Sequence, residues 1–140
     1  MKKKRVKDLL YPKLSYEIQG IAMTIRNQYG SGHKEKIYQR AFAEELGFRK
    51  IDFKQEPSIK IFSQRTGKCI GIYRPDFVVE DKIIIEIKAL SFAPKKLVDQ
   101  LYKYLENSNY ELGYFINFGS SKLFIKRIIY SNKNKKFRVQ

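Results

Sequence analysis

The first third of the chain holds two segments whose apolar residues recur at helical spacing. In residues 13–29 the apolar positions lie three or four residues apart, at Leu14, Ile18, Ile21 and Ile25. Turn residues, Tyr29-Gly30-Ser31-Gly32, end this segment. A second apolar stripe follows Gly32 and stops at Gly47; its members are Ile37, Tyr38, Ala41, Phe42 and Leu46. The pattern therefore predicts two amphipathic helices that form one wall of a core.

Beyond residue 55 the pattern changes to β-branched and aromatic runs separated by turn residues. The predicted strands are Glu56–Ile61, Cys69–Val79, Ile83–Lys88, Leu112–Phe118 and Leu123–Tyr130. Between the third and fourth of these, Pro94 fits the first turn of a helix that runs to about Asn107. The order ααβββαββ predicts an α/β fold of the α+β kind, a mixed sheet flanked by helices, in one domain over residues 1–140.

Charge and composition narrow the classes of partner and chemistry. The 140 residues carry 29 Lys+Arg against 14 Asp+Glu, a net charge of +15, which favours polyanions such as DNA or RNA. A single cysteine, Cys69, excludes an internal disulfide and fits a reducing, cytoplasmic compartment. One histidine, His33, excludes multi-histidine zinc sites. The apolar runs are far shorter than the about 20 residues of a membrane span, so we expect no membrane.

Three charged residues near the middle of the chain form the first candidate site. Alternation along Ile83–Lys88 places Glu86 and Lys88 on one face of the strand. A three-residue connection, Glu80-Asp81-Lys82, would pair Val79 with Ile83 and so oppose Asp76 to Glu86. A two-residue turn would separate them, so a joint site requires an odd connection or a β-bulge. The alternative is an exposed sheet face with a modest ion pair.

Glu35 is a fourth candidate, because it shares a helical face with Tyr38 and Phe42. A carboxylate on a face that points toward the core is unusual. The position also has a simpler explanation: if Gly32 is the N-cap, Glu35 is the third helical residue, where an acid favours the helix dipole. The residue alone does not decide between the two explanations.

Four motifs in order give the chain a family resemblance. Gly32 to Tyr38 has the form G-x-x-E-x-x-Y, and Pro75-Asp76 with Glu86-Ile87-Lys88 has the form PD...E-x-K. Further on, the chain has Gln100-Leu101-Tyr102-Lys103-Tyr104-Leu105 and Phe115-Ile116-Asn117-Phe118-Gly119. Together these motifs resemble the GxxExxY family of the PD-(D/E)XK nuclease superfamily over roughly residues 14–130. One departure is Ser31-Gly32-His33-Lys34, where relatives commonly carry Pro-Gly and apolar residues.

The resemblance implies a fold and a set of roles. It implies a restriction-endonuclease-like core in which Asp76 and Glu86 hold Mg²⁺ or Mn²⁺, supported by Glu35 directly or through water. Lys88 would orient or deprotonate the attacking water and stabilise charge at the phosphate, and Gln100 would be an auxiliary site residue. Oxygen ligands suit Mg²⁺, which keeps several waters, so two or three carboxylates suffice.

Other residues fit nucleic-acid contact, although each also has a plain structural explanation. Arg74 could hold a phosphate bidentately, Tyr104 could stack on a base, and His33 could meet a phosphate. The net charge also lies mostly at the ends: residues 1–13 hold six Lys+Arg and one acid, and residues 122–140, which include the basic C-terminal segment 131–140, hold seven Lys+Arg and no acid. We expect these basic segments to attract a polyanion.

The sequence analysis therefore favours one function and leaves a second open. The first is a metal-dependent nuclease that hydrolyses phosphodiester bonds of DNA. The alternative is a catalytically silent nucleic-acid-binding module, or a homodimeric structural or regulatory protein, that keeps the nuclease fold. A homodimer is compatible with either function, by analogy with other nucleases of this kind that cut duplexes.

Overall fold

A computed structural model describes residues 10–138 of the chain. Its elements in chain order are α2 (Pro12–Tyr29), α3 (Glu35–Phe48), β1 (Phe53–Gln55), β2 (Ile59–Phe62), β3 (Cys69–Tyr73), β4 (Phe77–Val79), β5 (Ile83–Lys88), α4 (Lys95–Glu106), β6 (Leu112–Asn117) and β7 (Phe124–Ile129). Two short 3-10 turns follow, η1 (Asn132–Asn134) and η2 (Lys136–Arg138). No helix among the described residues is long and apolar enough to span a membrane.

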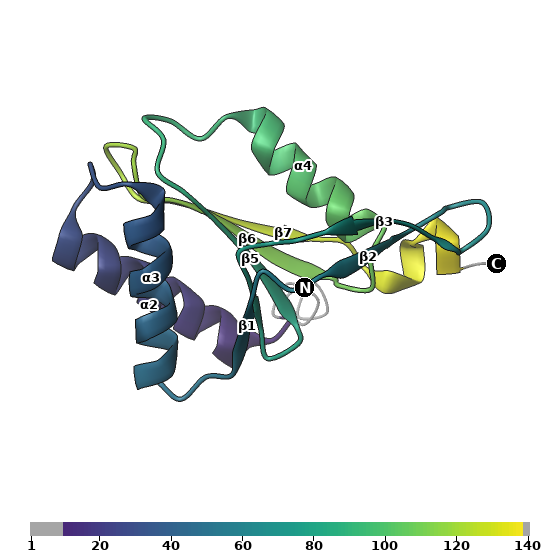
Figure 1. The fold of residues 1–140 in the computed structure, drawn as a ribbon, viewed down its shortest axis with the longest axis horizontal. Coiled ribbons are helices and arrows are strands. Elements are labelled where there is room, and N and C mark those ends of the chain that lie inside the picture. Colours follow the sequence, from purple (N-terminus) through teal and green to yellow (C-terminus); the bar gives the residue numbers. More distant parts are fainter. Residues whose placement is uncertain (1–9, 139–140) are drawn as a thin grey trace, which may run out of the picture.

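The main sheet has five strands in the order β1-β4-β5-β6-β7. Only β5 and β6 are parallel, and α4 connects them, as a parallel pair requires a crossover. The pairs β1–β4, β4–β5 and β6–β7 are antiparallel. The predicted mixed sheet flanked by helices is therefore confirmed (Figure 1).

Each face of this sheet buries its own apolar cluster. Ile83, Ile85 and Ile87 of β5 pack with residues of α2 and α3, whereas Ile84 packs with Leu101 and Leu105 of α4. These two sets alternate along β5, as the strand pleat requires. The fold consequently has three layers, with α2 and α3 on one side of the sheet and α4 on the other (Figure 1).

Several predicted boundaries were wrong for local reasons. The strand predicted over Cys69–Val79 is split into β3 and β4, because Pro75 cannot donate a hydrogen bond to a strand ladder. β3 pairs with β2 in a separate two-stranded sheet. The sequence analysis missed β1, which has only three residues. The last predicted helix begins at Lys95, so Pro94 is its N-cap rather than part of its first turn.

The start of α3 also differs from expectation. Its N-cap is Lys34, which makes Glu35 the first helical residue, and Gly32 lies before the helix with φ of 104°. The helix continues through Gly47 to Phe48. Ile37, expected on the apolar stripe, is 40% exposed, whereas Tyr38, Phe42 and Leu46 are buried as predicted. The shifted start makes Glu35, which is half-buried, the first residue of the helix, where an acid still favours the helix dipole.

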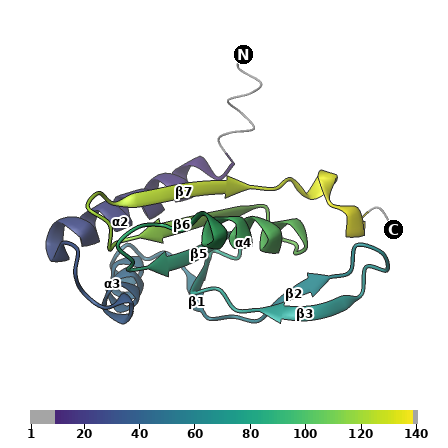
Figure 2. The same cartoon turned by 90° about the horizontal axis from the view of Figure 1, so that it is seen from above.

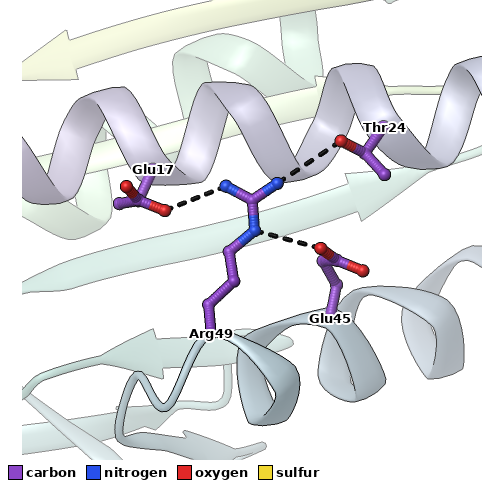
Figure 3. A network of polar contacts seen from close by, with 4 residues as sticks. All are labelled: Glu17, Thr24, Glu45 and Arg49. Atoms are coloured by element: carbon purple, nitrogen blue, oxygen red, sulfur yellow. Dashed lines mark hydrogen bonds and ion pairs between the residues drawn. The ribbon is translucent and has the colours of Figure 1, made fainter.

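Arg49, immediately after α3, joins the two N-terminal helices (Figure 3). Its guanidinium donates to Glu17 at 2.9 Å and to Thr24 at 3.4 Å, both on α2, and to Glu45 on α3 at 3.0 Å. Gly20 leaves room for this group, since a Cβ there would lie 3.2 Å from Arg49 Nη1. The network fixes how α3, which carries Glu35, lies against α2.

The basic C-terminal segment is partly built into the fold rather than wholly solvated. Lys135 is fully buried, and its ammonium donates to the carbonyl oxygen of Ser108 at 2.7 Å and to that of Tyr110. Phe137 is also buried. Part of the positive charge at this end therefore has a structural role. Of the N-terminal basic segment, residues 1–9 lie outside the described residues.

Candidate active site

The β4–β5 hairpin brings Asp76 and Glu86 together. Val79 pairs with Ile83 and Phe77 with Ile85, which is the register predicted for a three-residue connection. Glu80 and Asp81 in that connection both have positive φ, at 55° and 54°. Continued by one residue, the register opposes Asp76 to Glu86, and the Asp76 amide donates to Glu86 Oε1 at 3.3 Å. The odd connection thus places both carboxylates on the face of the sheet that α4 covers.

Asp76 is held by its backbone surroundings as well as by side chains. It follows β3 and Pro75 and precedes β4. The amide of Ile87 on β5 donates to Asp76 Oδ2 at 2.6 Å. The Asp76 carbonyl in turn accepts from the amide of Glu56 at 3.0 Å. The first bond fixes the carboxylate against β5, and the second fixes the Asp76 backbone against the residue that follows β1.

Tyr73 orients Glu86, a role that the sequence analysis did not predict. Its hydroxyl donates to Glu86 Oε2. Burial and the neighbouring Glu86 raise the pKa of Tyr73 far above its usual value, so the phenol stays a donor. The Tyr73 ring stacks on Tyr104 of α4, with centroids 3.7 Å apart and planes 10° apart. Tyr104, predicted to stack on a base, thus uses one ring face to position Tyr73.

Gln39 links Glu35 to Asp76 and was also missed. Its side-chain amide donates to Glu35 Oε2 at 3.0 Å and to Asp76 Oδ1 at 3.2 Å. The i, i+4 spacing from Glu35 was the available signal, since residues four apart on a helix are neighbours. The structure therefore connects Glu35 to Asp76 through Gln39 and not by direct contact between the carboxyls.

Burial and mutual repulsion dominate the electrostatics of these acids. Burial, then the neighbouring Asp76, raise the pKa of Glu86 to about 7. Burial also raises the pKa of Asp76 and of Glu35. Lys88 opposes all three shifts, because its ammonium favours the ionised carboxylates. The three acids and Lys88 therefore form one electrostatically connected site, in which added positive charge would stabilise the ionised forms.

The comparison with protein families identifies this arrangement. The family model described as PD-(D/E)XK nuclease superfamily matches residues 12–128. The chain belongs to the PD-(D/E)XK nuclease superfamily. Searches of curated proteins and of solved structures returned no match. The matched range includes both helices before the sheet and every strand except the last residue of β7, so the superfamily assignment covers the whole candidate site.

PD-(D/E)XK nucleases generally use divalent metals such as Mg²⁺, and the donors at this site suit such an ion. Asp76 and Glu86 supply four hard oxygens, each of which accepts one hydrogen bond and keeps a second acceptor position. Within residues 10–138 no three His, Cys, Asp or Glu side chains converge closely enough to hold one ion together. A carboxylate pair with water completing the shell therefore fits better than a three-carboxylate cage.

The loop after Lys88 is clamped by the late I-N-F-G motif. The Asn117 side chain accepts from the Leu90 amide at 2.8 Å and donates to the Leu90 carbonyl at 3.0 Å. The Phe118 amide donates to the Lys88 carbonyl at 2.9 Å. A Cβ on Gly119 would lie 2.5 Å from the Leu90 carbonyl oxygen, so only glycine allows this approach. In this nuclease fold the motif positions the backbone that carries Lys88.

Of the remaining predicted residues, Gln100 and Arg74 are both exposed. Gln100 is exposed on α4 and lines a hollow with Lys96 and Lys103, and among the described residues no hydrogen bond joins it to Asp76, Glu86 or Lys88. Arg74, next to the site in the chain, is exposed and donates to Ser58 at 3.2 Å.

His33 lies at the entry to α3. It is exposed, and its ring packs edge-on against Tyr38 at 6.0 Å between centroids. Its amide donates to the Tyr38 hydroxyl at 3.2 Å. His33 is therefore part of the turn that starts α3, and its exposed ring stays available for contact.

Two surface hollows differ in their relation to the acids. A hollow of about 180 Å³ lies beside Asp76 and is also lined by Gln39, Lys36 and Arg40. The larger hollow, about 960 Å³, is at the opposite end of β4, where Glu80 and Lys82 meet the start of α2. The small hollow has a polar lining in which the cations Lys36 and Arg40 lie with the acids Asp76 and Glu56, so we take it as part of the site.

Proposed function

We propose that this chain is a divalent-metal-dependent nuclease of the GxxExxY type that hydrolyses phosphodiester bonds of DNA. The observation that carries the proposal is the pairing of Asp76 and Glu86 across the β4–β5 hairpin, with Lys88 acting electrostatically on both. A protein that only bound nucleic acid would gain nothing from two half-buried carboxylates, because they repel phosphate. Membership of the superfamily supports the same function.

In this proposal Asp76 and Glu86 hold Mg²⁺ or Mn²⁺. The ion, when bound, lowers the pKa of a coordinated water and offsets negative charge on the scissile phosphate. The Tyr73 hydroxyl and the Ile87 amide fix the two carboxylates before the ion arrives. Glu35, joined to Asp76 through Gln39, supports the ion through water.

Lys88 stabilises the charge that develops at the phosphate. Its ammonium acts on Glu35, Asp76 and Glu86, so it is near enough to these acids to act also on a phosphate that binds beside them. The clamp by Asn117 and Gly119 holds its backbone in place. Gln100 would join this set only through movement or through water, and we assign it an auxiliary role.

Substrate reaches the carboxylates past basic side chains. Lys36 and Arg40 on α3 are exposed beside the hollow at Asp76, and Arg74 is exposed on the other side of Pro75. His33 and Tyr104 complete the proposed nucleic-acid contacts. These cations offset the repulsion between the acids and the phosphate backbone.

The experiment is a substrate panel incubated with Mg²⁺ or Mn²⁺. Plasmid, linear, branched and single-stranded DNA, with an RNA duplex beside them, are offered to wild type, Glu86→Gln and Glu44→Gln. Glu44 is an exposed acid on the same helix as Glu35 and serves as the matched control. We expect cleavage of DNA by wild type and by Glu44→Gln that Glu86→Gln and EDTA abolish. Binding without any cleavage across the panel would instead establish the silent nucleic-acid-binding module.

A further inference from the structure

The β2–β3 hairpin, residues 59–74, forms a two-stranded ribbon apart from the main sheet (Figure 2). Its inner face packs on α4: Ile59 and Tyr73, which pair directly, lie in the same apolar cluster as Leu101 and Leu105. Neither strand pairs with the five-stranded sheet. The ribbon is thus fixed along one face and open along the other.

The outer face of the hairpin is apolar and cationic at once. Ile70 is 69% exposed and Ile72 is 54% exposed. Lys60 lies directly opposite Ile72. Ile70 is the extra residue of a β-bulge, since Ile61 pairs with Gly71 and Phe62 with Cys69. Ile70 and Ile72, two residues apart on the same strand, thus place neighbouring apolar side chains beside a cation on the surface.

All the charges in the hairpin are positive. Residues 59–74 contain Lys60, Arg65, Lys68 and Arg74 and no acid, and all four are exposed. In a symmetric dimer the same hairpin of a second copy would present the same charge and would be repelled. A polyanion is the partner whose charge complements this surface.

The far end of the hairpin is braced rather than free. The Phe62 backbone amide donates to the Asn107 carbonyl at 2.8 Å, and the Gln64 side-chain amide donates to Asn107 Oδ1 at 2.9 Å. The Phe62 ring stacks on Phe137, with centroids 5.0 Å apart. The ribbon is therefore preorganised, which reduces the entropy lost when it binds a partner.

The hairpin is also continuous with the candidate active site. β3 runs from the outer turn toward the main sheet, and its last residue, Tyr73, holds Glu86 (Figure 2). Arg74 follows it directly, and Asp76 lies two residues further on. A polyanion lying along the hairpin would thus lead into the carboxylate site.

We propose that the β2–β3 hairpin is an arm that binds double-stranded DNA and guides it to the site, with Lys60, Arg65 and Lys68 on phosphates and Ile70 and Ile72 against a groove. The inference rests on the proposed nuclease function for the identity of that site. The DNA major groove admits a two-stranded β-ribbon. Its counterpart in duplex RNA is too deep and narrow.

The aliphatic side chains on the outer face of the hairpin favour duplex DNA over single-stranded DNA as the partner. Binding of single strands relies on exposed aromatic rings on which bases stack. The large exposed apolar residues of the hairpin are both isoleucines, and its aromatic residues Phe62 and Tyr73 are stacked on other rings. The surface consequently fits sugar and base edges in a groove better than unpaired bases.

The test measures DNA binding in EDTA, where no cleavage occurs, by fluorescence anisotropy. The hairpin variant is Lys60→Gln/Arg65→Gln/Lys68→Gln. The matched control, Lys50→Gln/Lys54→Gln/Lys82→Gln, removes the same charge from exposed positions that follow α3, lie on β1 and precede β5, respectively. We expect the hairpin variant to bind a short DNA duplex about tenfold or more weakly, with a salt slope lower by about 2–3. The control should lose less than about threefold.

A second variant, Ile70→Ser/Ile72→Ser, tests the groove contact. Because it removes no charge, we expect weaker duplex binding with an unchanged salt slope, and little change for single-stranded DNA or duplex RNA. The proposal that the hairpin is a DNA-binding arm would be overturned by equal losses of duplex affinity in the two charge variants. It would also be overturned if Ile70→Ser/Ile72→Ser binds duplex DNA as tightly as wild type. A wild-type dimer that this variant converts to a monomer on size exclusion would likewise overturn it.

Cleavage assays separate failure of the arm from failure of the nuclease function. If wild type never cuts DNA but the hairpin variant alone loses duplex binding, the arm stands and the nuclease proposal fails. If wild type cuts and the hairpin variant binds and cuts duplex as well as wild type, the nuclease proposal stands and the arm fails. Thermal unfolding of each variant, expected within about 2–4 °C of wild type for exposed substitutions, shows that the fold is intact.

Discussion

Glu86 is the residue on which most of the site's interactions meet. It accepts from Tyr73 and from the Asp76 amide, and its carboxyl is repelled by that of Asp76. In the metal-free protein this environment costs folding free energy whenever Glu86 is ionised. A carboxylate kept in such a place is typical of a functional site rather than of a structural one.

The pH dependence of stability reports that cost. Because the pKa of Glu86 is raised from 4.5 to about 7, the folded protein binds more protons than the unfolded chain between these values. Stability from this group is present below pH 4.5 and is lost as pH rises through 7. We expect Glu86→Gln to be more stable than wild type by about 1–3 kcal/mol at pH 8, and by much less at pH 4.5. Urea unfolding in EDTA measures the difference; a constant difference across this range contradicts the prediction.

Tyr73→Phe removes only the hydroxyl that orients Glu86. The Phe ring keeps the stack on Tyr104, so the fold should survive. Loss of a group that positions a metal ligand typically weakens metal binding about 10–100-fold. Calorimetric titration with Mn²⁺ should show this loss for Tyr73→Phe and not for Tyr104→Phe. If Tyr73→Phe bound Mn²⁺ as tightly as wild type, Tyr73 would not be a residue that positions Glu86 for metal binding.

The sequence analysis predicted the charged residues of the candidate site but not the residues that position them. Asp76, Glu86 and Lys88 stand out in the sequence because charged residues interrupt apolar strands. Tyr73 and Gln39 do not, since tyrosine is common in strands and glutamine is common in helices. Their roles depend on which side chain from another element lies opposite, and only the three-dimensional structure supplies that.

At the scale of elements, the pattern of the sequence was most informative where a strand is long and alternating. Ile83–Lys88 was predicted with its bounds and faces, and the length of the connection before it fixed the register. The split of β3 from β4 was not predicted, because apolar residues continue on both sides of Pro75. β1 was missed because a three-residue strand has too few positions to show alternation.

Gly119→Ala tests the clamp between β6 and the loop after β5. A Cβ there would lie 2.5 Å from the Leu90 carbonyl oxygen and 2.6 Å from the Ala89 carbonyl carbon. Since the backbone must move to admit this Cβ, we expect the free energy of unfolding to fall by about 1–3 kcal/mol. We also expect slower cleavage, because the displaced backbone carries Lys88. Gly47→Ala is the control: it lies inside α3 with nothing within 4 Å of the added Cβ. Chemical denaturation should show Gly47→Ala gaining about 0.5–1 kcal/mol, and a Gly119→Ala protein as stable as wild type would contradict the clamp.

For the whole molecule, the charge distribution is more specific than the sequence alone implied. The net charge of +15 was expected to act mainly through basic ends. In the described residues positive charge also lies on the β2–β3 hairpin, which contains no acid, and on Lys36 and Arg40 beside the hollow at Asp76. Part of the C-terminal charge, at Lys135, is buried and serves the fold.

Lys135→Met therefore tests structure rather than nucleic-acid binding. It leaves the carbonyl oxygens of Ser108 and Tyr110 without their donor, at a cost of about 1–3 kcal/mol. Lys133→Met, at an exposed position nearby, should change stability by less than about 0.5 kcal/mol. Thermal unfolding compares the two variants.

Removal of residues 133–140 takes away basic residues of the C-terminal segment, which we expect to attract a polyanion, but it also takes away Lys135. We therefore expect the truncated protein to be less stable than wild type. A truncated protein as stable as wild type would contradict the structural role of this segment.

The nuclease assignment is tested most directly by the rate at which one DNA duplex is cut in Mg²⁺ by wild type, Glu86→Gln and Glu44→Gln. The predicted result is cleavage by wild type and by Glu44→Gln at similar rates, with Glu86→Gln slower by at least about a hundredfold. Cleavage by Glu86→Gln at the wild-type rate, or no cleavage by wild type, would contradict the assignment.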